Sequence, residues 1–266
     1  MDPGIDLVLC AEAVRRLDEV HALLSYGGGV PEPSAAAANP LRYKISWTWE
    51  GVLNSYARPA RILQDGQPSA VAPAELFDER HTHTIDVPEL GAMEAFPNGD
   101  AVAYVERLGI AGTVRSAGRY ALRWPGHCRL WQSLVDLGFL EDAPVPGFPA
   151  EISPRQFMIR HLEPRLQYLL HERDVVIVRV QADGVRDRRP RRITLELVDR
   201  KDTSSGLTAM SRTVGFSASI AAQMIARGAI AARGLLSPTR DVPYGAFVDE
   251  LARRSIVVRE TEDGPE

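Results

Sequence analysis

The stretch at residues 25–49, SYGGGVPEPSAAAANPLRYKISWTW, constrains the fold more than any other part of the chain. Gly27, Gly28 and Gly29 follow an apolar run that is typical of a strand. Glycine lets the backbone approach a ligand closely or adopt a positive φ, and the prolines that follow stiffen the chain. The pattern therefore predicts a shaped loop at the end of a strand, of the kind that lines a cleft.

Hydrophobic periodicity and turn residues predict alternating helices and strands over the first half of the chain. Asp100 precedes an apolar-periodic run, and its carboxylate can accept hydrogen bonds from the first amides of a helix. We therefore interpret Asp100 as a helix cap. The predicted elements are a helix at 5–17, strands at 20–26 and 60–63, a turn at Asp65 and Gly66 with a return through Val71, a helix at 50–57, strands at 83–87, 91–96 and 112–122, and helices at 100–108 and 126–137.

The second half of the chain begins with a proline-rich break at 143–150. Two β-branched runs, at 175–180 and 193–198, predict a hairpin whose turn lies at Asp183 and Gly184 or at Pro190. The remaining predictions are a helix from Ser153 and Pro154 to about residue 170, a long helix at 206–230, a helix at 244–253, a strand at 256–258 and a disordered acidic end at 260–266. This mixture predicts an α+β fold, a mixed sheet flanked by helices.

Composition excludes several classes of protein. The formal charge of −4 argues against a binder of nucleic acid or of anionic membranes. Cys10 and Cys128 cannot form a disulfide framework, and no cysteine or histidine has the spacing of a structural zinc site. The sequence has no secretion signal and no apolar run of ~18 residues, so we expect a cytoplasmic protein with no membrane span.

Other site chemistries have little support in the residues. His81 and His83 would share one face of a strand near Asp86, but no third metal ligand is evident, so we expect no metal site. Neither G-x-S-x-G nor H-E-x-x-H occurs, which leaves hydrolase hypotheses without a basis.

The sequence resembles the saccharopine dehydrogenase (saccharopine reductase) family in several blocks that follow one another in the same order. The first is DPGID at residues 2–6, and the second is the SYGGGVPEP and NPLRYKISW stretch. The others are FPNGD at 96–100, which is similar to the family's YPNRD, VRSAGRY at 114–120, similar to IRGTLRY, and TVGF at 213–216, similar to TVGYP.

The resemblance implies the chemistry of that family, in which an imine is reduced or the secondary amine of saccharopine is oxidised with NADP or NAD as the hydride carrier. It places Asp2, the catalytic candidate, between the cofactor and the substrate amine. Arg119 matches a substrate-binding arginine, whose planar fork suits a carboxylate. Asn98, Gly27 and Gly28 complete the implied substrate site. Pro3 and Thr48 match positions that contact the cofactor; alternatively, the Thr48 hydroxyl is satisfied by backbone.

The chain departs from the family at positions that bear on specificity. Gly99 stands where YPNRD has its arginine, and Ala117 and Gly118 replace Thr and Leu. Losing one arginine–carboxylate contact costs roughly 1.5–3 kcal/mol. We therefore expect a substrate other than the tricarboxylic saccharopine.

The family's dinucleotide-binding Rossmann domain precedes DPGID, whereas this sequence has no G-x-G-x-x-G. We expect residues 1–24 to be the remnant of that junction, 25–205 a substrate-binding and dimerisation domain, and 206–266 helices that return toward the cofactor domain. The chain would then be a fragment, a subunit that borrows a partner Rossmann subunit, or a protein that has lost hydride transfer. A homo-oligomer and a small amino-acid-like substrate are the expected partners.

Three functions follow from these alternatives. The first is an NAD(P)-dependent oxidoreductase acting on CH–NH groups, or its substrate-binding half. The second is a non-catalytic binding or assembly protein that keeps the scaffold without cofactor. The third, suggested by kinship alone, is a polyamine-condensing synthase of the homospermidine or carboxynorspermidine type.

Overall fold

The computed structural model describes residues 1–147 and 151–264. Within them, the strands form one nine-stranded sheet in the order β3-β2-β6-β1-β7-β8-β9, and β4 joins through β5, which pairs with β6. The strands are β1 (Glu19–Pro31), β2 (Ala60–Gln64), β3 (Gln67–Val71), β4 (His83–Val87), β5 (Gly91–Pro97), β6 (Ser116–Arg123), β7 (Asp174–Arg186), β8 (Arg189–Arg200) and β9 (Val258–Asp263).

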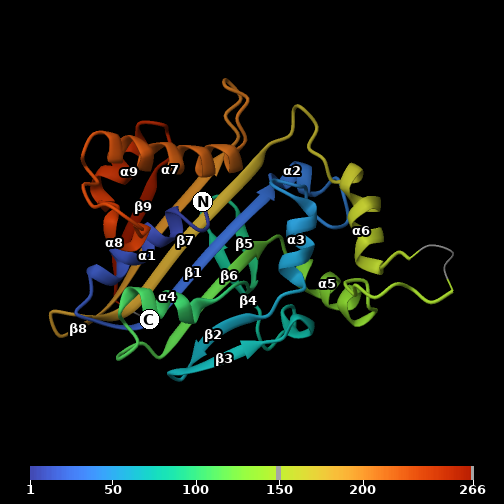
Figure 1. The fold of residues 1–266 in the computed structure, drawn as a ribbon, viewed down its shortest axis with the longest axis horizontal. Coiled ribbons are helices and arrows are strands. Elements are labelled where there is room, and N and C mark those ends of the chain that lie inside the picture. Colours follow the sequence, from blue (N-terminus) through green and yellow to red (C-terminus); the bar gives the residue numbers. More distant parts are fainter. Residues whose placement is uncertain (148–150, 265–266) are drawn as a thin grey trace.

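Helices flank this sheet, so the predicted α+β class is confirmed (Figure 1). Strands β1 and β6 run parallel, whereas β1 pairs antiparallel with β7. The helices are α1 (Ile5–Arg15), α2 (Pro33–Ala36), α3 (Trp49–Tyr56), α4 (Ala101–Leu108), α5 (His127–Asp136), α6 (Pro154–Leu162), α7 (Ala209–Ala226), α8 (Pro238–Asp241) and α9 (Tyr244–Ala252).

One buried core packs α1, α4, α7 and α9 against the sheet. Successive residues of a strand point to opposite faces. Val176, Val178 and Val180 of β7 therefore enter this core, while Val175 and Ile177 enter a second core under β4 and β5. Burial on both faces explains the nearly unbroken β-branched run of this strand.

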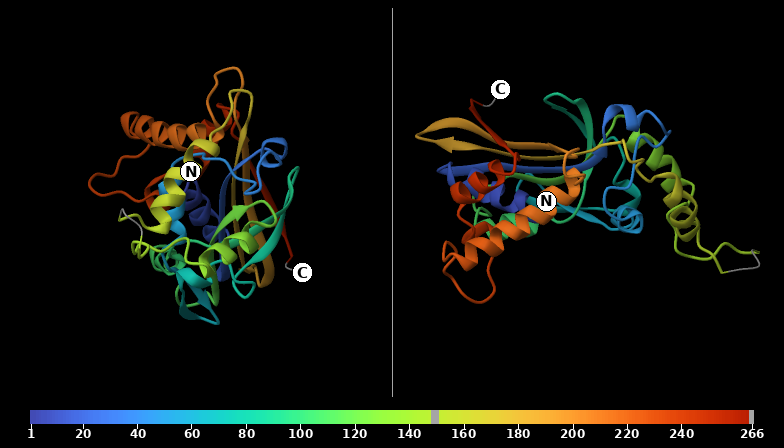
Figure 2. Two further views of the ribbon diagram at one scale, coloured as in Figure 1. Left: turned by 90° about the vertical axis from the view of Figure 1, so that its right-hand side faces the viewer. Right: turned by 90° about the horizontal axis from the view of Figure 1, so that it is seen from above.

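A third core, rich in aromatic residues, joins α3, α5 and α6 at the other end of the sheet. Trp49, Tyr56, Phe96 and Trp131 form its centre, with ring centroids of neighbouring pairs 4.9 to 6.0 Å apart. Figures 1 and 2 show α6 at this end of the molecule and α7 at the opposite end, along the outside. Val214 and Ile225 on the outer side of α7 are 48% and 53% exposed.

The predicted loop at residues 27–29 is wrong. Gly27, Gly28 and Gly29 continue β1, opposite Val178, Ile177 and Val176 of β7. Pairing with β7 at all three residues, and with β6 at Gly27, fixes an extended backbone that glycine propensity alone does not favour. The strand ends only at Pro31.

The predicted turn of the β7–β8 hairpin is also wrong. Both strands extend beyond Asp183 and Pro190, and the turn consists of Asp187 and Arg188, with φ values of 51° and 61°. Two left-handed residues match the twist of the flanking strands.

Several element ends differ from the predictions. Ser153 does begin a helix through a capping box with Gln156, but α6 ends at Leu162 and a 3-10 turn follows. The predicted disordered end is wrong for residues 260–263, because β9 pairs with β8. Residues 148–150 of the proline-rich break and 265–266 of the acidic end lie outside the described residues. Of the helices that the structure describes, none combines the length and the apolar character needed to cross a membrane.

Candidate functional site

A cavity of about 820 Å³ opens beside the carboxyl-terminal half of β1. Strands β1 and β6 are parallel neighbours, so their carboxyl ends reach the same edge, with Ser25 paired to Arg119 and Gly27 to Ala121. The start of the chain, the β5–α4 turn and the first turn of α7 close the sides. The lining residues are Met1, Asp2, Pro3, Gly27, Gly28, Gly29, Trp47, Ser55, Arg58, Pro59, Arg61, Asn98, Gly99, Asp100, Arg119, Tyr120, Ala121, Arg123, Met210, Ser211 and Val214.

The glycines of β1 leave room for this cavity. A Cβ added to Gly29 would lie 2.5 Å from the Met210 Cε and 2.8 Å from the Ser46 Oγ, and one added to Gly27 would lie 3.4 Å from the Asp2 Oδ2. The Asp174 carboxylate accepts hydrogen bonds from the Ala209 and Met210 amides at 2.8 and 2.9 Å, which fixes the start of α7 at this edge. The glycine run thus lines a cleft, as predicted, but does so from within a strand.

Asp2 and Arg119 meet in this cavity. The Arg119 guanidinium donates a hydrogen bond to the Asp2 carboxylate and lies over the Tyr104 ring, with its Cζ 4.5 Å from the ring centroid. Gly99 makes room for the guanidinium, because a Cβ at that residue would lie 2.5 Å from Arg119 Nη1. A side chain at position 99 would therefore require the flexible end of Arg119 to shift.

Behind this pair lies Asp6, which the sequence analysis did not assign to the site. Its buried carboxyl accepts hydrogen bonds from the Tyr104 hydroxyl and the Gly4 amide, each at 2.7 Å. Burial, followed by the negative charge of Asp2, raises the pKa of Asp6 to about 7. A carboxyl group that exchanges its proton near neutral pH therefore lies next to the Asp2–Arg119 pair. The sequence signal that could have indicated Asp6 is its position as a single acid among the apolar residues at the start of the first helix.

Asn98 and Asp100 belong to the turn between β5 and α4. The backbone N–H of Asn98 donates a hydrogen bond to the Arg119 carbonyl at 2.8 Å, which holds this turn against β6. Asp100 accepts a hydrogen bond from the Ala103 amide at 3.1 Å, so its predicted capping role is confirmed. It also forms an ion pair of 2.9 Å with Arg61.

The two predicted cofactor contacts separate in the structure. Pro3 lines the cavity beside Asp2. Thr48 lies outside it. The Thr48 hydroxyl caps α3 by accepting a hydrogen bond from the Gly51 amide at 3.5 Å, and Thr48 lines a different hollow beside α6. Contact between Thr48 and a cofactor stays a prediction.

The cavity carries an excess of positive charge. Four arginines and two aspartates line it, and the ion pairs Asp2–Arg119 and Asp100–Arg61 use both acids. In the part of the chain that the structure describes, Arg58 and Arg123 form no ion pair. Such a surface favours an anionic ligand over a cationic one. Sequence reasoning missed both arginines, because no recognisable motif contains them.

The histidine pair lies elsewhere. The His83 Nε2 is 3.0 Å from the Tyr26 hydroxyl, and its ring packs edge-on against Tyr120 with centroids 4.6 Å apart. His83 is therefore engaged by tyrosines of the sheet.

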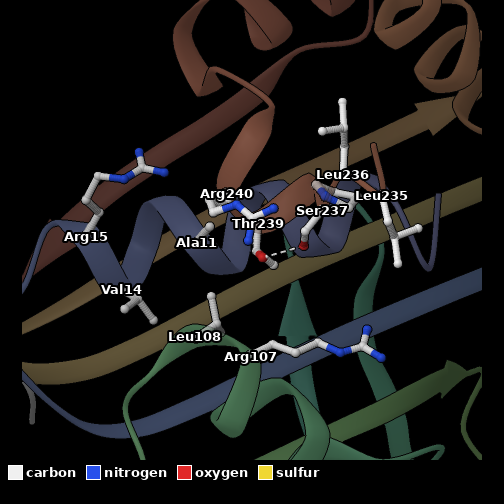
Figure 3. A pocket seen from close by; sticks show the side chains of 11 residues that line it. Ala11, Val14, Arg15, Arg107, Leu108, Leu235, Leu236, Ser237, Thr239 and Arg240 are labelled. Carbon is white, nitrogen blue, oxygen red and sulfur yellow. Dashed lines mark hydrogen bonds between the residues drawn. The ribbon is translucent and has the colours of Figure 1, made fainter. Parts of the chain in front are cut away.

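A second hollow, of about 930 Å³, lies between α1, α4 and the segment before α8 (Figure 3). None of the predicted site residues lines it. In Figure 3 the guanidinium groups of Arg15, Arg107 and Arg240 lie apart and do not converge on one point. Arg15 pairs with Glu12, and Arg240 pairs with Asp241 at 3.0 Å. We therefore assign the candidate site to the cavity around Asp2 and Arg119.

Comparison with known proteins gives the family. A family model described as "Saccharopine dehydrogenase C-terminal domain" matches residues 1–256. The chain belongs to this family. It is 27% identical to the mitochondrial alpha-aminoadipic semialdehyde synthase of Mus musculus over 97% of this chain and 34% of that protein.

Two further family relatives share most of this chain. One is the saccharopine dehydrogenase [NADP(+), L-glutamate-forming] of Pyricularia oryzae, 28% identical over 96% of this chain and 70% of the relative. The other is the apo structure of the histidine-tagged saccharopine dehydrogenase (L-Glu forming) from Saccharomyces cerevisiae, with a TM-score of 0.84, 23% identity and coverage of 99% of this chain and 72% of that one. The latter shows the shared fold. The chain spans about a third of the length of the mouse synthase that it matches.

Proposed function

We propose that this chain is the substrate-binding part of a saccharopine-dehydrogenase-type oxidoreductase that acts on an amino-acid-derived imine or secondary amine. The observation that carries the proposal is the meeting of Asp2 and Arg119 in one positively charged cavity. These residues lie far apart in the sequence, and their motifs predict catalysis for Asp2 and substrate binding for Arg119. Membership of the family and its NADP-dependent relatives support the same reaction class.

In this proposal, Asp2 moves the proton that the substrate nitrogen gains or loses, and Arg119 orients both Asp2 and a substrate carboxylate. Asp6 stores a proton behind them, since its pKa of about 7 allows both protonation states at neutral pH. Tyr104 connects Asp6 with the Asp2–Arg119 pair: its hydroxyl donates a hydrogen bond to Asp6, and Arg119 lies over its ring.

A nicotinamide cofactor would supply the hydride, but the residues that the structure describes do not form a dinucleotide cradle. A phosphate cradle needs a glycine-rich turn that opens a helix. The glycine run at 27–29 is instead strand, paired with β7 along its whole length and with β6 at Gly27. A separate dinucleotide-binding unit therefore belongs to the proposal, and the half-exposed Val214 and Ile225 of α7, one of them at the cavity rim, support a covering partner there.

The test combines cofactor binding with turnover. NADPH fluorescence is titrated with the purified chain alone and with a candidate dinucleotide-binding partner, and reduction of NADP⁺ by saccharopine and related secondary amines is then followed. We expect binding and turnover with the partner, and a loss of turnover in Asp2→Asn without a loss of NADPH binding. Absence of NADPH binding at millimolar concentration in both arrangements would overturn the proposal and leave a binding or assembly role.

The alternative functions differ in their support. A non-catalytic binding or assembly role remains the alternative that the NADPH titration tests. A polyamine-condensing synthase is disfavoured, because four arginines would repel a polycationic substrate.

A further inference from the structure

Two walls of the candidate cavity meet at Gly29 of β1. A Cβ added to Gly29 would lie 2.8 Å from the Ser46 Oγ and 2.5 Å from the Met210 Cε. Trp47, which follows Ser46, lines the cavity, and so does Met210. The first wall is the segment at residues 44–47, ahead of α3, and the second is the first turn of α7. The contacts that hold these two walls therefore decide the shape of the cavity.

The first wall is hydrogen-bonded to the loop between α6 and β7. The Ile45 amide donates to the Leu166 carbonyl at 2.9 Å. The Lys44 Nζ donates to the Gln167 carbonyl at 3.1 Å and to the Glu172 carboxylate at 2.6 Å. The side chains of Lys44 and Glu172 are each 8% exposed, so solvent screens this ion pair only weakly.

Glu172 also orders its own loop. Its Oε2 accepts a hydrogen bond from the Leu169 amide at 2.7 Å, and its backbone carbonyl accepts one from the Lys201 Nζ at 3.1 Å. The Lys201 Nζ also donates to the Leu170 carbonyl at 2.7 Å. Burial would raise the pKa of Glu172, but the hydrogen bonds from Lys44 and the Leu169 amide outweigh it and hold that pKa below its ordinary value. The carboxylate is therefore charged.

The second wall is bonded to the same short segment. Asp174 lies two residues beyond Glu172, and its carboxylate accepts from the Ala209 and Met210 amides at the start of α7. The Asp174 carbonyl accepts from the Lys201 amide at 3.2 Å. Residues 172–174, at the end of the sheet where β7 begins, are thus bonded to both walls of the cavity (Figure 1).

The use of lysine in the sequence indicates the same segment. Of the 31 lysines and arginines, two are lysines, Lys44 and Lys201. Both donate hydrogen bonds to oxygen atoms of residues 167–172. A lysine ammonium is a compact donor of three hydrogen bonds, which suits oxygens that converge on one point better than the planar fork of arginine does.

We propose that Glu172 is a positioning residue of the candidate site. Through Lys44 it holds the first wall in the shape that receives the substrate before any ligand binds, and Asp174 does the same for the second wall. Residues 172–174 are thus a brace that sets the spacing of the two walls. Because the walls are ordered in advance, ligand binding costs less conformational entropy. The inference rests on the proposed function only in taking this cavity as the substrate site.

Hydrogen exchange of the unliganded full chain tests the brace. Lys44→Met/Glu172→Gln removes both charges, so that neither is left buried without a partner. We expect amide exchange in residues 44–49 to become faster by about tenfold or more, the effect of losing a charge-assisted hydrogen bond, while α4 exchanges as in the wild type. Asp174→Asn should have the same effect on residues 209–212.

Arg179→Met/Glu196→Gln is the matched control. These side chains, 15% and 7% exposed, form an ion pair between β7 and β8, and neither lines the cavity. The control should leave exchange in residues 44–49 and 209–212 unchanged. A pair that only stabilises the fold would lower the melting temperature without loosening the cavity walls below the transition.

Trp47 provides a second readout at the first wall. It is 53% exposed, whereas the other three tryptophans are at most 4% exposed, so acrylamide quenching of the folded chain reports Trp47. We expect steeper quenching in Lys44→Met/Glu172→Gln than in the wild type and in the control pair. Where quenching and exchange disagree, exchange in residues 44–49 decides.

Unchanged exchange in residues 44–49 of the folded double variant would overturn the inference, as would an equal change in the control pair. Unchanged exchange in residues 209–212 of Asp174→Asn would overturn the part that concerns α7. If Lys44→Met/Glu172→Gln does not fold, Glu172→Gln alone decides by the same readouts. These measurements need neither NADPH nor a partner, so their failure is distinguishable from failure of the proposed function.

Discussion

Asp6 combines burial with two hydrogen bonds and a nearby second carboxylate, so its protonation is linked to folding. The groups that face it are Asp2, Tyr104, Arg119 and the buried Cys10. Its pKa is raised in the folded protein to about 7 from an ordinary 3.8. Between these values the folded state holds a proton that the unfolded state has lost. The contribution of Asp6 to stability is therefore fully present below about pH 4 and is lost as the pH rises through 7.

Replacing Asp6 with Asn should remove this dependence, because the amide keeps the shape without titrating. Urea unfolding at pH 5 and pH 8 should show that the wild type loses on the order of 1–4 kcal/mol more than Asp6→Asn over this interval. Identical pH dependence of the two proteins would mean that Asp6 is ionised in the fold.

Gly29 is packed too closely by Met210 and Ser46 to accept a larger side chain without a loss of stability. Gly29→Ala would place a methyl group within 2.5 Å of Met210 and 2.8 Å of Ser46, so we expect a loss of about 1–3 kcal/mol and a smaller cavity. Gly215→Ala in α7 is the control: nothing lies within 4 Å of the added carbon, and alanine should stabilise the helix by up to ~1 kcal/mol. Thermal melts should show a lower melting temperature for Gly29→Ala and a higher one for Gly215→Ala. A gain in stability for Gly29→Ala would contradict the close packing around Gly29.

At this scale the sequence indicated Asp2 and Arg119 through their motifs, and Asp100 through capping chemistry. It did not indicate Asp6, Tyr104 or Arg123. Their importance comes from burial and from neighbours that only the tertiary fold brings together.

At the scale of elements, the residue types of the β7–β8 hairpin were misleading. Gly184 and Pro190 are turn residues by composition, but they pair within the strands opposite Arg191 and Val185. The turn uses Asp187 and Arg188 instead, and an arginine at a φ of 61° is strained. The glycine run of β1 misled for the same reason, since its pairing with β7 overrides local propensity. Helices α4 and α9 were predictable, because their buried residues recur with the helical period, whereas α1 is buried at every residue from Ile5 to Ala11.

Arg188→Gly should therefore stabilise the protein, by about 0.5–1 kcal/mol, because glycine adopts this conformation without strain. Arg189→Gly is the matched control within β8 and should be destabilising. Equilibrium unfolding in urea measures both; an equal effect of the two changes would show that the turn carries no strain.

At the scale of the whole molecule, the three cores differ in whether they contain a tryptophan, whose fluorescence reports unfolding. The four tryptophans are Trp47, Trp49, Trp124 and Trp131, and none belongs to the core that joins α1, α7 and α9 to the sheet. That core takes residues from Ile5 to Ile256, across all the segments that the sequence suggested as separate parts. The division at 1–24, 25–205 and 206–266 stays a prediction, because a common core does not by itself define evolutionary or functional units.

Leu9→Ala tests whether the cores unfold together. Leu9 is fully buried in α1, so truncation should cost about 2–5 kcal/mol. If the molecule is one cooperative unit, the tryptophan fluorescence midpoint should fall together with the midpoint of the far-ultraviolet circular dichroism. A fluorescence midpoint that stays at the wild-type value would show that the aromatic core unfolds independently.

Strand β9 is an outer edge of the sheet, with β8 as its one neighbour in the described chain. It carries Arg259, Glu260, Glu262 and Asp263, which are exposed. Two molecules aligned along this edge would bring carboxylates together, and charged edges resist the addition of a further strand. We therefore expect that copies of this protein do not grow into a continuous sheet, and that self-association, where it occurs, proceeds through a different face.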